Sequence, residues 1–252
     1  MDKGEEKEFS IENCVLNFLN TILILGGNGI IAIGILKQIY ISDIGIFTNN
    51  IISNTPTIII SIGIAVAVIS VFYFCVLTKQ KFFCMTLCSV LFAIVFIIQI
   101  TIGIGILVKR DEGNNIIKYN MYKTLMRYQV DEIMKKNWNK LQKSKKCCGV
   151  GNTSDWIVFT KASEIPRSCC SGNSIECKIS FYENSTLFKN GCFEKIAREI
   201  NFGINVYEIV NSIVCVLEFE IVLYGHYYIR VSRKIKEFKK PEESETSESS
   251  ES

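Results

Sequence analysis

Six of the eleven cysteines lie in one polar stretch, where their thiols could form disulfides or hold a metal ion. They are Cys147, Cys148, Cys169, Cys170, Cys177 and Cys192. Cytosolic chains rarely concentrate cysteines without a metal or a redox task. The two vicinal pairs lack the C-x2-C spacing with which two thiolates share one tetrahedral zinc ion. The pattern therefore favours disulfides over the alternative of a zinc site, and it places this stretch outside the cytosol.

Disulfides would supply much of the stability of such a small domain, since burial alone stabilises small domains weakly. Closing a loop of about 15 residues contributes about 3 kcal/mol on the chain-entropy model. Three such bonds would rival the total stability of a small domain. Six cysteines allow fifteen pairings, and their spacing does not choose among them. Gly149 follows the first vicinal pair and can adopt a positive φ, which would turn the chain sharply.

Four long apolar runs must position this polar stretch in a chain of 252 residues with mean hydropathy +0.25. The predicted membrane spans are residues 15–40, 57–77, 82–108 and 204–229. Each run has the roughly 20 mostly apolar residues that a helix needs to cross the hydrocarbon core. In lipid the backbone must satisfy its own hydrogen bonds, which predicts helices rather than strands. The first run is too long for a cleaved signal peptide and is expected to be a retained anchor.

Basic residues set the orientation of the four spans. Lys79 and Lys81 lie between the second and third spans, and a cluster of Lys and Arg follows the fourth, so both connections are expected in the cytosol. The cytosolic segments would be residues 1–14, 78–81 and 230–252, and the extracellular ones 41–56 and 109–203. The predicted fold class is therefore an all-α membrane protein with four transmembrane helices and a small disulfide-stapled helical extracellular domain.

The large loop carries its own pattern of elements. Residues 116–146 lack Gly and Pro and have apolar residues at nearly helical spacing, which predicts one amphipathic helix continuing the third span. A helical turn is expected around 155–159, a loop-rich cap at 171–190, and a second helix at 192–201. Asn152 and Asn184 begin N-x-S/T sequons, and both are candidates for N-glycosylation if the loop is extracellular.

The motifs of this loop resemble those of the tetraspanin family, and the resemblance extends over nearly the full chain. The residues that carry it are Cys147-Cys148-Gly149, Asp155-Trp156, Pro166 with Ser168-Cys169-Cys170, and Gly191-Cys192. The resemblance implies three disulfides. They are Cys147 with Cys192, Cys148 with Cys169, and Cys170 with Cys177. Lys145 departs from the family pattern, which usually has a large apolar residue just before the cysteines.

Three polar residues lie deep in the predicted spans: Asn20, Gln99 and Glu218. Such groups are costly in lipid and tend to face other helices or a cavity. The resemblance suggests a cavity for a sterol or another lipid, with Asn20 and Glu218 at its polar end. The alternative is hydrogen bonding between helices without a ligand. Glu220 points nearly opposite to Glu218 on a helix, so it is either protonated or marks a partner helix.

Small residues predict close packing of the first span. Asn20, Gly27 and Gly34 recur every seven residues and share one helix face. Glycines on such a face let two helices approach closely in lipid.

Three juxtamembrane cysteines, Cys14, Cys75 and Cys84, are candidates for S-palmitoylation. The alternative is that they are small buried apolar residues. Cys88 and Cys215 lie too deep in the predicted spans for acylation.

Catalysis has no evident machinery in the sequence, and we predict that the chain is not an enzyme. The only histidine, His226, lies across the membrane from the large loop, and phosphate-binding glycine loops, H-E-x-x-H and Rossmann motifs are missing. The basic run at 135–146 is interpreted as a solvated helix face, so nucleic acid is not an expected partner. Three scattered polar residues do not line an ion channel.

The resemblance implies a scaffold that organises other integral membrane proteins, including other tetraspanins, laterally in the cell membrane. It implies no cofactor, although a sterol or other membrane lipid is an expected ligand of the cavity. Residues 171–190 are expected to contact partners, and endosomal or vesicle pools are expected besides the cell membrane. The alternative function is a receptor-like protein whose large loop binds one soluble or viral ligand.

Overall fold

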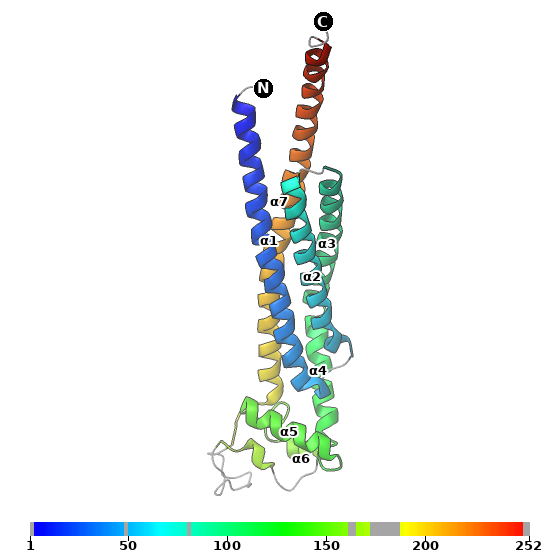
Figure 1. The fold of residues 1–252 in the computed structure, drawn as a ribbon. Helices are drawn as coiled ribbons and strands as arrows, with labels where there is room; N and C mark the ends of the chain where they lie inside the picture. Colours follow the sequence, from blue (N-terminus) through cyan, green and yellow to red (C-terminus); the bar gives the residue numbers. More distant parts are fainter. Residues whose placement is uncertain (1–2, 48–49, 80–81, 161–164, 172–186, 249–252) are drawn as a thin grey trace. The chain divides into compact units, whose positions relative to one another are not determined.

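The computed structural model is helical throughout almost all of the residues that it describes, 3–47, 50–79, 82–160, 165–171 and 187–248 (Figure 1). The elements are α1 (Lys3–Ile44), η1 (Gly45–Phe47), α2 (Asn50–Lys79), α3 (Phe82–Val108), α4 (Arg110–Leu125), α5 (Glu132–Lys145), α6 (Asp155–Thr160), η2 (Arg167–Cys169) and α7 (Cys192–Glu248). Within those ranges the β-type pairing is a single isolated bridge between Cys170 and Leu187. The predicted all-α membrane fold is confirmed.

Three helices among the described residues are long and apolar enough to cross a membrane. They are Asn13–Ser42, Asn54–Lys79 and Phe83–Val108, and they coincide with the first three predicted spans. The fourth predicted span, 204–229, is helical within α7 but is not one of these three. Its assignment as a span stays a prediction, and it contains Glu208, Glu218 and Glu220.

The chain divides into two compact units, and four long helices contribute residues to both. The first, here called the helical bundle, comprises Met1–Ile33, Ile59–Ile104 and Glu208–Ser252. The second, here called the loop domain, comprises Gly34–Ile58 and Gly105–Tyr207. The loop domain extends beyond the two predicted extracellular loops, since it also includes residues 34–40, 57–58, 105–108 and 204–207 at the ends of the predicted spans.

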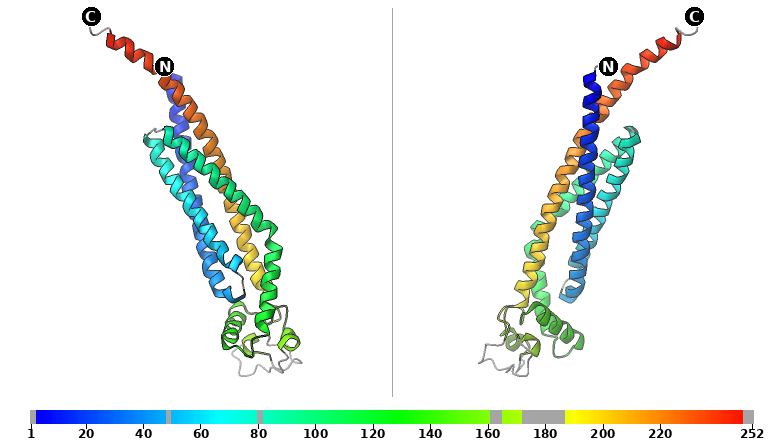
Figure 2. Two further views of the ribbon diagram at one scale, coloured as in Figure 1. Left: turned by 90° about the vertical axis from the view of Figure 1, so that its right-hand side faces the viewer. Right: turned by 60° about the vertical axis from the view of Figure 1, so that its left-hand side comes forward.

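Within the helical bundle the helices pack in the cyclic order α1, α2, α3, α7 (Figure 2). A Cβ added to Gly27 would lie 3.2 Å from the backbone nitrogen of Ala67, so α1 and α2 meet backbone to backbone. Tyr73 of α2 packs edge-on against Phe92 of α3, with ring centroids 5.9 Å apart. This close approach at Gly27 agrees with the small-residue face predicted for the first span.

The single amphipathic helix predicted over 116–146 is wrong, because the chain breaks between α4 and α5. Asp131 has an extended backbone and caps α5, since its carboxylate accepts the backbone N–H groups of Ile133 (2.9 Å) and Met134 (3.2 Å). An aspartate that satisfies otherwise unpaired N–H groups starts a new helix. This break lets α5 leave the direction of α4, and Trp138 of α5 then donates to Thr124 Oγ1 of α4.

Candidate functional site

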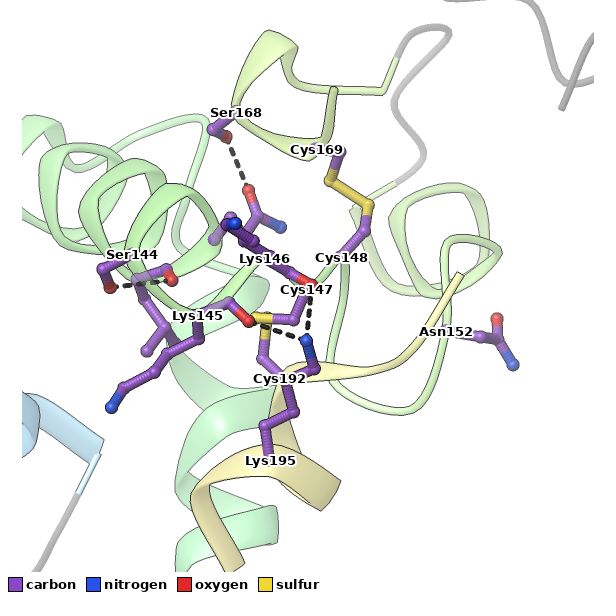
Figure 3. The surroundings of a disulfide bond; sticks show 12 residues. Ser144, Lys145, Lys146, Cys147, Cys148, Asn152, Ser168, Cys169, Cys192 and Lys195 are labelled. Atoms are coloured by element: carbon purple, nitrogen blue, oxygen red, sulfur yellow. Dashed lines mark hydrogen bonds between the residues drawn. A yellow bond between two sulfur atoms is a disulfide. The ribbon is translucent and has the colours of Figure 1, made fainter. Parts of the chain in front are cut away.

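The loop domain is held by disulfides that begin at two neighbouring residues. Cys147 is bonded to Cys192, with Cα atoms 4.9 Å apart, and Cys148 to Cys169, with Cα atoms 5.0 Å apart (Figure 3). These are two of the pairs that the resemblance implied. Cys170 is disulfide-bonded as well, and its expected partner Cys177 lies outside the described residues.

Local backbone geometry turns the two cysteines in different directions. Lys146 ends α5 in the left-handed conformation, with φ of 51°, and the Cys147 N–H donates to the Gln142 carbonyl at 3.1 Å. Gly149 has φ of 69°, and a Cβ there would lie 1.9 Å from the Asn152 carbonyl oxygen. Only glycine fits this turn without strain, which explains the residue that follows the vicinal cysteines.

The same turn is joined by backbone hydrogen bonds to the residues at the start of α7. The Cys148 N–H donates to Asn190, and the Cys192 N–H donates to Gly149, each at 3.0 Å. Between them, a Cβ on Gly191 would lie 2.3 Å from the carbonyl oxygen of Val150. Because backbone atoms cannot move aside, the glycine before Cys192 is a packing requirement.

Asp155 stabilises the turn, and Trp156 fills the core beneath it. The buried Asp155 carboxylate accepts the backbone N–H groups of Gly151 at 2.6 Å and Asn152 at 3.2 Å. Trp156 is fully buried and packs edge-on against Tyr128, with ring centroids 4.7 Å apart. Burial raises the pKa of Tyr128. The Asp-Trp motif is therefore structural.

We expect Asp155→Ala to lower the free energy of unfolding of the loop domain by about 3 kcal/mol, because two N–H groups lose a charged acceptor. Unfolding in urea can be followed by tryptophan emission, since the only two tryptophans, Trp138 and Trp156, both lie in this core. Asp111→Ala, at an exposed position in the first turn of α4, is the matched control and should cost less than half as much. Equal effects of the two substitutions would contradict the assigned role.

The Pro-x-Ser-Cys-Cys segment is hydrogen-bonded to α5 through the hydroxyl group of Ser168. Ser168 Oγ lies 2.6 Å from Gln142 Oε1 and 2.7 Å from Asn139 Oδ1, so it can donate to either amide oxygen. Pro166 precedes the short helix η2, which leads into Cys169. Together with the Cys148–Cys169 bond, this contact holds the segment against the C-terminal half of α5.

The core also includes residues that the sequence analysis did not select. Phe47, from the segment after α1, packs edge-on against Trp138 of α5 with ring centroids 5.2 Å apart. The Trp138 Nε1–H donates to Thr124 Oγ1 at 3.3 Å. Phe47 is a large aromatic residue in the short connection between two apolar runs, and burying such a residue requires a partner surface.

Polar contacts explain why Lys145 can stand where the family usually has a large apolar residue. Its ammonium group pairs with the Glu199 carboxylate on α7 and lies 4.7 Å from the centre of the Tyr40 ring. A cation over an aromatic ring and an ion pair replace apolar packing at this position. Nearby, Lys195 Nζ donates to the carbonyl oxygens of Lys145 and Lys146 at 2.9 Å, which caps the end of α5 (Figure 3).

In the helical bundle, the polar residues predicted within the membrane join pairs of helices. Gln99 Nε2 of α3 donates to Glu218 Oε1 of α7 at 2.9 Å. Asn20 Nδ2 of α1 donates to the Ser70 carbonyl oxygen of α2, also at 2.9 Å. The structure thus brings Gln99 and Glu218 together and places Asn20 at a different helix pair. Both contacts are hydrogen bonds between helices, as in the alternative without a ligand. The lipid cavity stays a prediction.

Two further polar residues of this interface were missed. On α7, Glu208 and Asn211 face Gly103 of α3, where an added Cβ would lie 3.1 Å from Glu208 Oε2 and 3.4 Å from Asn211 Nδ2. They occur three residues apart and share a helix face with Cys215 and Glu218, a periodicity that could have identified them.

The remaining predicted sites differ in accessibility. Cys14 and Cys75 are exposed and Cys84 is partly exposed, whereas Cys88 and Cys215 are buried. Asn152 is exposed. Asn184 and most of the predicted partner-binding cap at 171–190 lie outside the described residues.

Comparison with known proteins gives a consistent match over most of the chain. The model described as "Tetraspanin family" matches residues 13–230. CD63 antigen of Rattus norvegicus is 28% identical over 171 residues, which cover 67% of this chain and 71% of that protein. Leukocyte surface antigen CD53 of Bos taurus is 28% identical over 172 residues, covering 68% and 78%. Tetraspanin-4 of Mus musculus is 26% identical over 188 residues, covering 70% and 75%.

Proposed function

Because this chain belongs to the tetraspanin family, we propose that it is a scaffold that gathers other integral membrane proteins laterally. The observation that carries the proposal is the family match across residues 13–230, which include all four predicted spans and the large loop. Members of this family associate with other membrane proteins, and other tetraspanins are the first expected partners.

The roles of the motif residues support this proposal. The cysteines, glycines and Asp155 of the signature are engaged in disulfides, turns and backbone hydrogen bonds, which suits a rigid platform rather than a reaction centre. Partner contact then belongs to exposed surface. Val130 and Ile133, at the corner between α4 and α5, are 86% and 67% exposed and offer apolar surface for such contact.

The scaffold proposal is tested by co-purification of the tagged full-length chain in a mild detergent. We expect several integral membrane proteins to be recovered, and a harsher detergent should remove them. The variant Cys147→Ser with Cys192→Ser is the control, because a disrupted loop domain should lose the partners that bind it. Recovery of one soluble ligand in place of membrane proteins would support the receptor-like alternative.

We further propose that the loop domain faces the cell exterior or a vesicle lumen and that both termini are cytosolic. If so, Asn152 should carry a glycan, and Asn152→Gln should abolish a mobility shift on N-glycosidase treatment of an Asn184→Gln background. The exposure of Asn152 supports this expectation. A protein from cells that shows no shift at either sequon would count against the orientation.

Acylation of at least one of Cys14, Cys75 and Cys84 is part of the same proposal, since acyl chains favour lateral association. Their accessibility, in contrast to buried Cys88 and Cys215, supports it. Hydroxylamine-dependent exchange that leaves all three unlabelled would exclude it.

A further inference from the structure

One face of α7 in the helical bundle has the spacing of a helix-packing seam but is not covered by α1 or α3. Ile209, Ile213, Val216, Leu223 and Tyr227 are each half or more exposed. With Glu220 they follow steps of 4, 3, 4, 3 and 4 residues, counted from 209 through 213, 216, 220 and 223 to 227. Helices that pack along their length meet through this spacing. We call these six residues the α7 seam.

The other faces of α7 are already occupied. Val214 lies against α1, where a Cβ added to Gly26 would approach it to 2.8 Å. Glu218 and Cys215 contact Gln99 of α3. The α7 seam is therefore the face of this helix that remains for lipid or for another protein.

Glu220 makes lipid a poor occupant of the α7 seam. Its side chain is partly exposed, and among the described residues its carboxylate has no hydrogen-bond or ion-pair partner. Arg230, the first lysine or arginine after it, is ten positions later, or about 15 Å along a helix. That is about half of a 30 Å hydrocarbon core. Glu220 thus lies near the membrane midplane, where its side chain cannot reach the headgroups and an ionisable group is costly.

A second copy of this chain fits the α7 seam less well than a different protein. Two copies in one membrane have the same orientation, so pairing along the seam would place Glu220 against Glu220. Like charges that face each other across an interface disfavour association. A helix with a basic residue at this depth would instead neutralise the carboxylate and bury the apolar residues on either side.

We propose that the α7 seam binds a membrane-spanning helix of a partner protein that carries a lysine or arginine at the level of Glu220. The inference rests on the proposed scaffold function and on 204–229 being the fourth span, and it names the class of partner. Apolar residues of the seam supply contact area, and Glu220 supplies selectivity, because an unpaired basic residue in lipid gains more from the contact than an apolar one.

The test uses the full-length chain in phosphatidylcholine vesicles and synthetic apolar helices that differ only at the central residue. Energy transfer between labelled chain and labelled helix measures association. A helix with central Lys should bind at least tenfold more tightly than the same helix with central Leu. Glu220→Leu should abolish this preference, and Glu220→Lys should transfer it to a helix with central Glu. Equal binding of the Lys and Leu helices to the unmodified chain, or a preference that survives Glu220→Leu, would overturn the proposal.

Two controls separate failure of this inference from other failures. Emission of Trp138 and Trp156 should match that of the unmodified chain, which verifies that the variant loop domain is folded. If the chain recovers membrane proteins from cells but shows no preference for the Lys helix, the scaffold function holds and the proposed binding of a basic helix by the α7 seam is wrong. If the Lys helix is preferred but no membrane proteins are recovered, the scaffold function is wrong and the recognition of a basic helix by the α7 seam holds.

Discussion

Replacing both Cys147 and Cys192 with serine should lower the free energy of unfolding of the loop domain by about 4 kcal/mol, the largest effect expected of any pair in the described residues. The bond closes a segment of 45 residues, and the chain-entropy model gives longer loops the larger stabilisation. Removing Cys148–Cys169, which closes 21 residues, should cost about 3 kcal/mol on the same model. Small domains have total stabilities of roughly 5–15 kcal/mol, so either loss is severe.

Emission of the two buried tryptophans during urea unfolding measures this loss. Cys14→Ser with Cys75→Ser is the control, because both residues are exposed and neither forms a disulfide. This control should unfold at the same urea concentration as the unmodified chain. A Cys147→Ser, Cys192→Ser variant whose midpoint also stays unchanged would show that packing around Trp138 and Trp156 holds the domain without the bond.

The second large effect is expected in the helical bundle, where Gly63→Val should force α1 and α2 apart and cost about 3 kcal/mol. A Cβ at Gly63 would lie 2.9 Å from both the Gly27 carbonyl oxygen and the Ile31 backbone nitrogen. These are backbone atoms of a neighbouring helix, so the strain cannot be relieved by a side-chain rotation. Close helix approach through small residues is a main source of association in lipid.

The bundle contains its own reporters for this measurement. In a background with Cys14, Cys75 and Cys84 replaced by serine, the free thiols of the described residues are the buried Cys88 and Cys215. Their reaction with a thiol-specific dye during heating marks opening of the bundle, and Gly63→Val should lower the temperature of that transition. Gly105→Val is the matched control, because nothing lies within 4 Å of a Cβ at that position. Equal shifts for both variants would attribute the effect to helix propensity rather than to packing.

Apolar length and local capping are readable from a sequence, whereas most tertiary partners are not. The first three spans could be predicted because lipid demands about 20 apolar residues in a row. The break before α5 was missed although Asp131 is a recognisable helix cap, because the periodicity of the flanking residues suggested one continuous helix. The disulfide partners needed the family resemblance, since spacing leaves fifteen pairings open.

Contacts between residues far apart in the sequence show more clearly what a single sequence cannot predict. Phe47 and Trp138 are 91 positions apart, and no periodic pattern links a short loop to the middle of a distant helix. Asn20 donates to a backbone carbonyl, which every residue has, so its partner Ser70 carries no signal. Gln99 and Glu218 were both selected for their depth, but only the structure pairs them.

The adjacency of Cys147 and Cys148 creates two nested rings, since the ring closed at Cys169 lies wholly inside the ring closed at Cys192. A peptide bond cut by a protease between Cys148 and Cys192 consequently leaves both new ends on the same molecule. Such a nicked chain would migrate as one species until a reductant separates its two fragments. A cut in this part of the loop domain therefore does not release the chain from Cys192 onward.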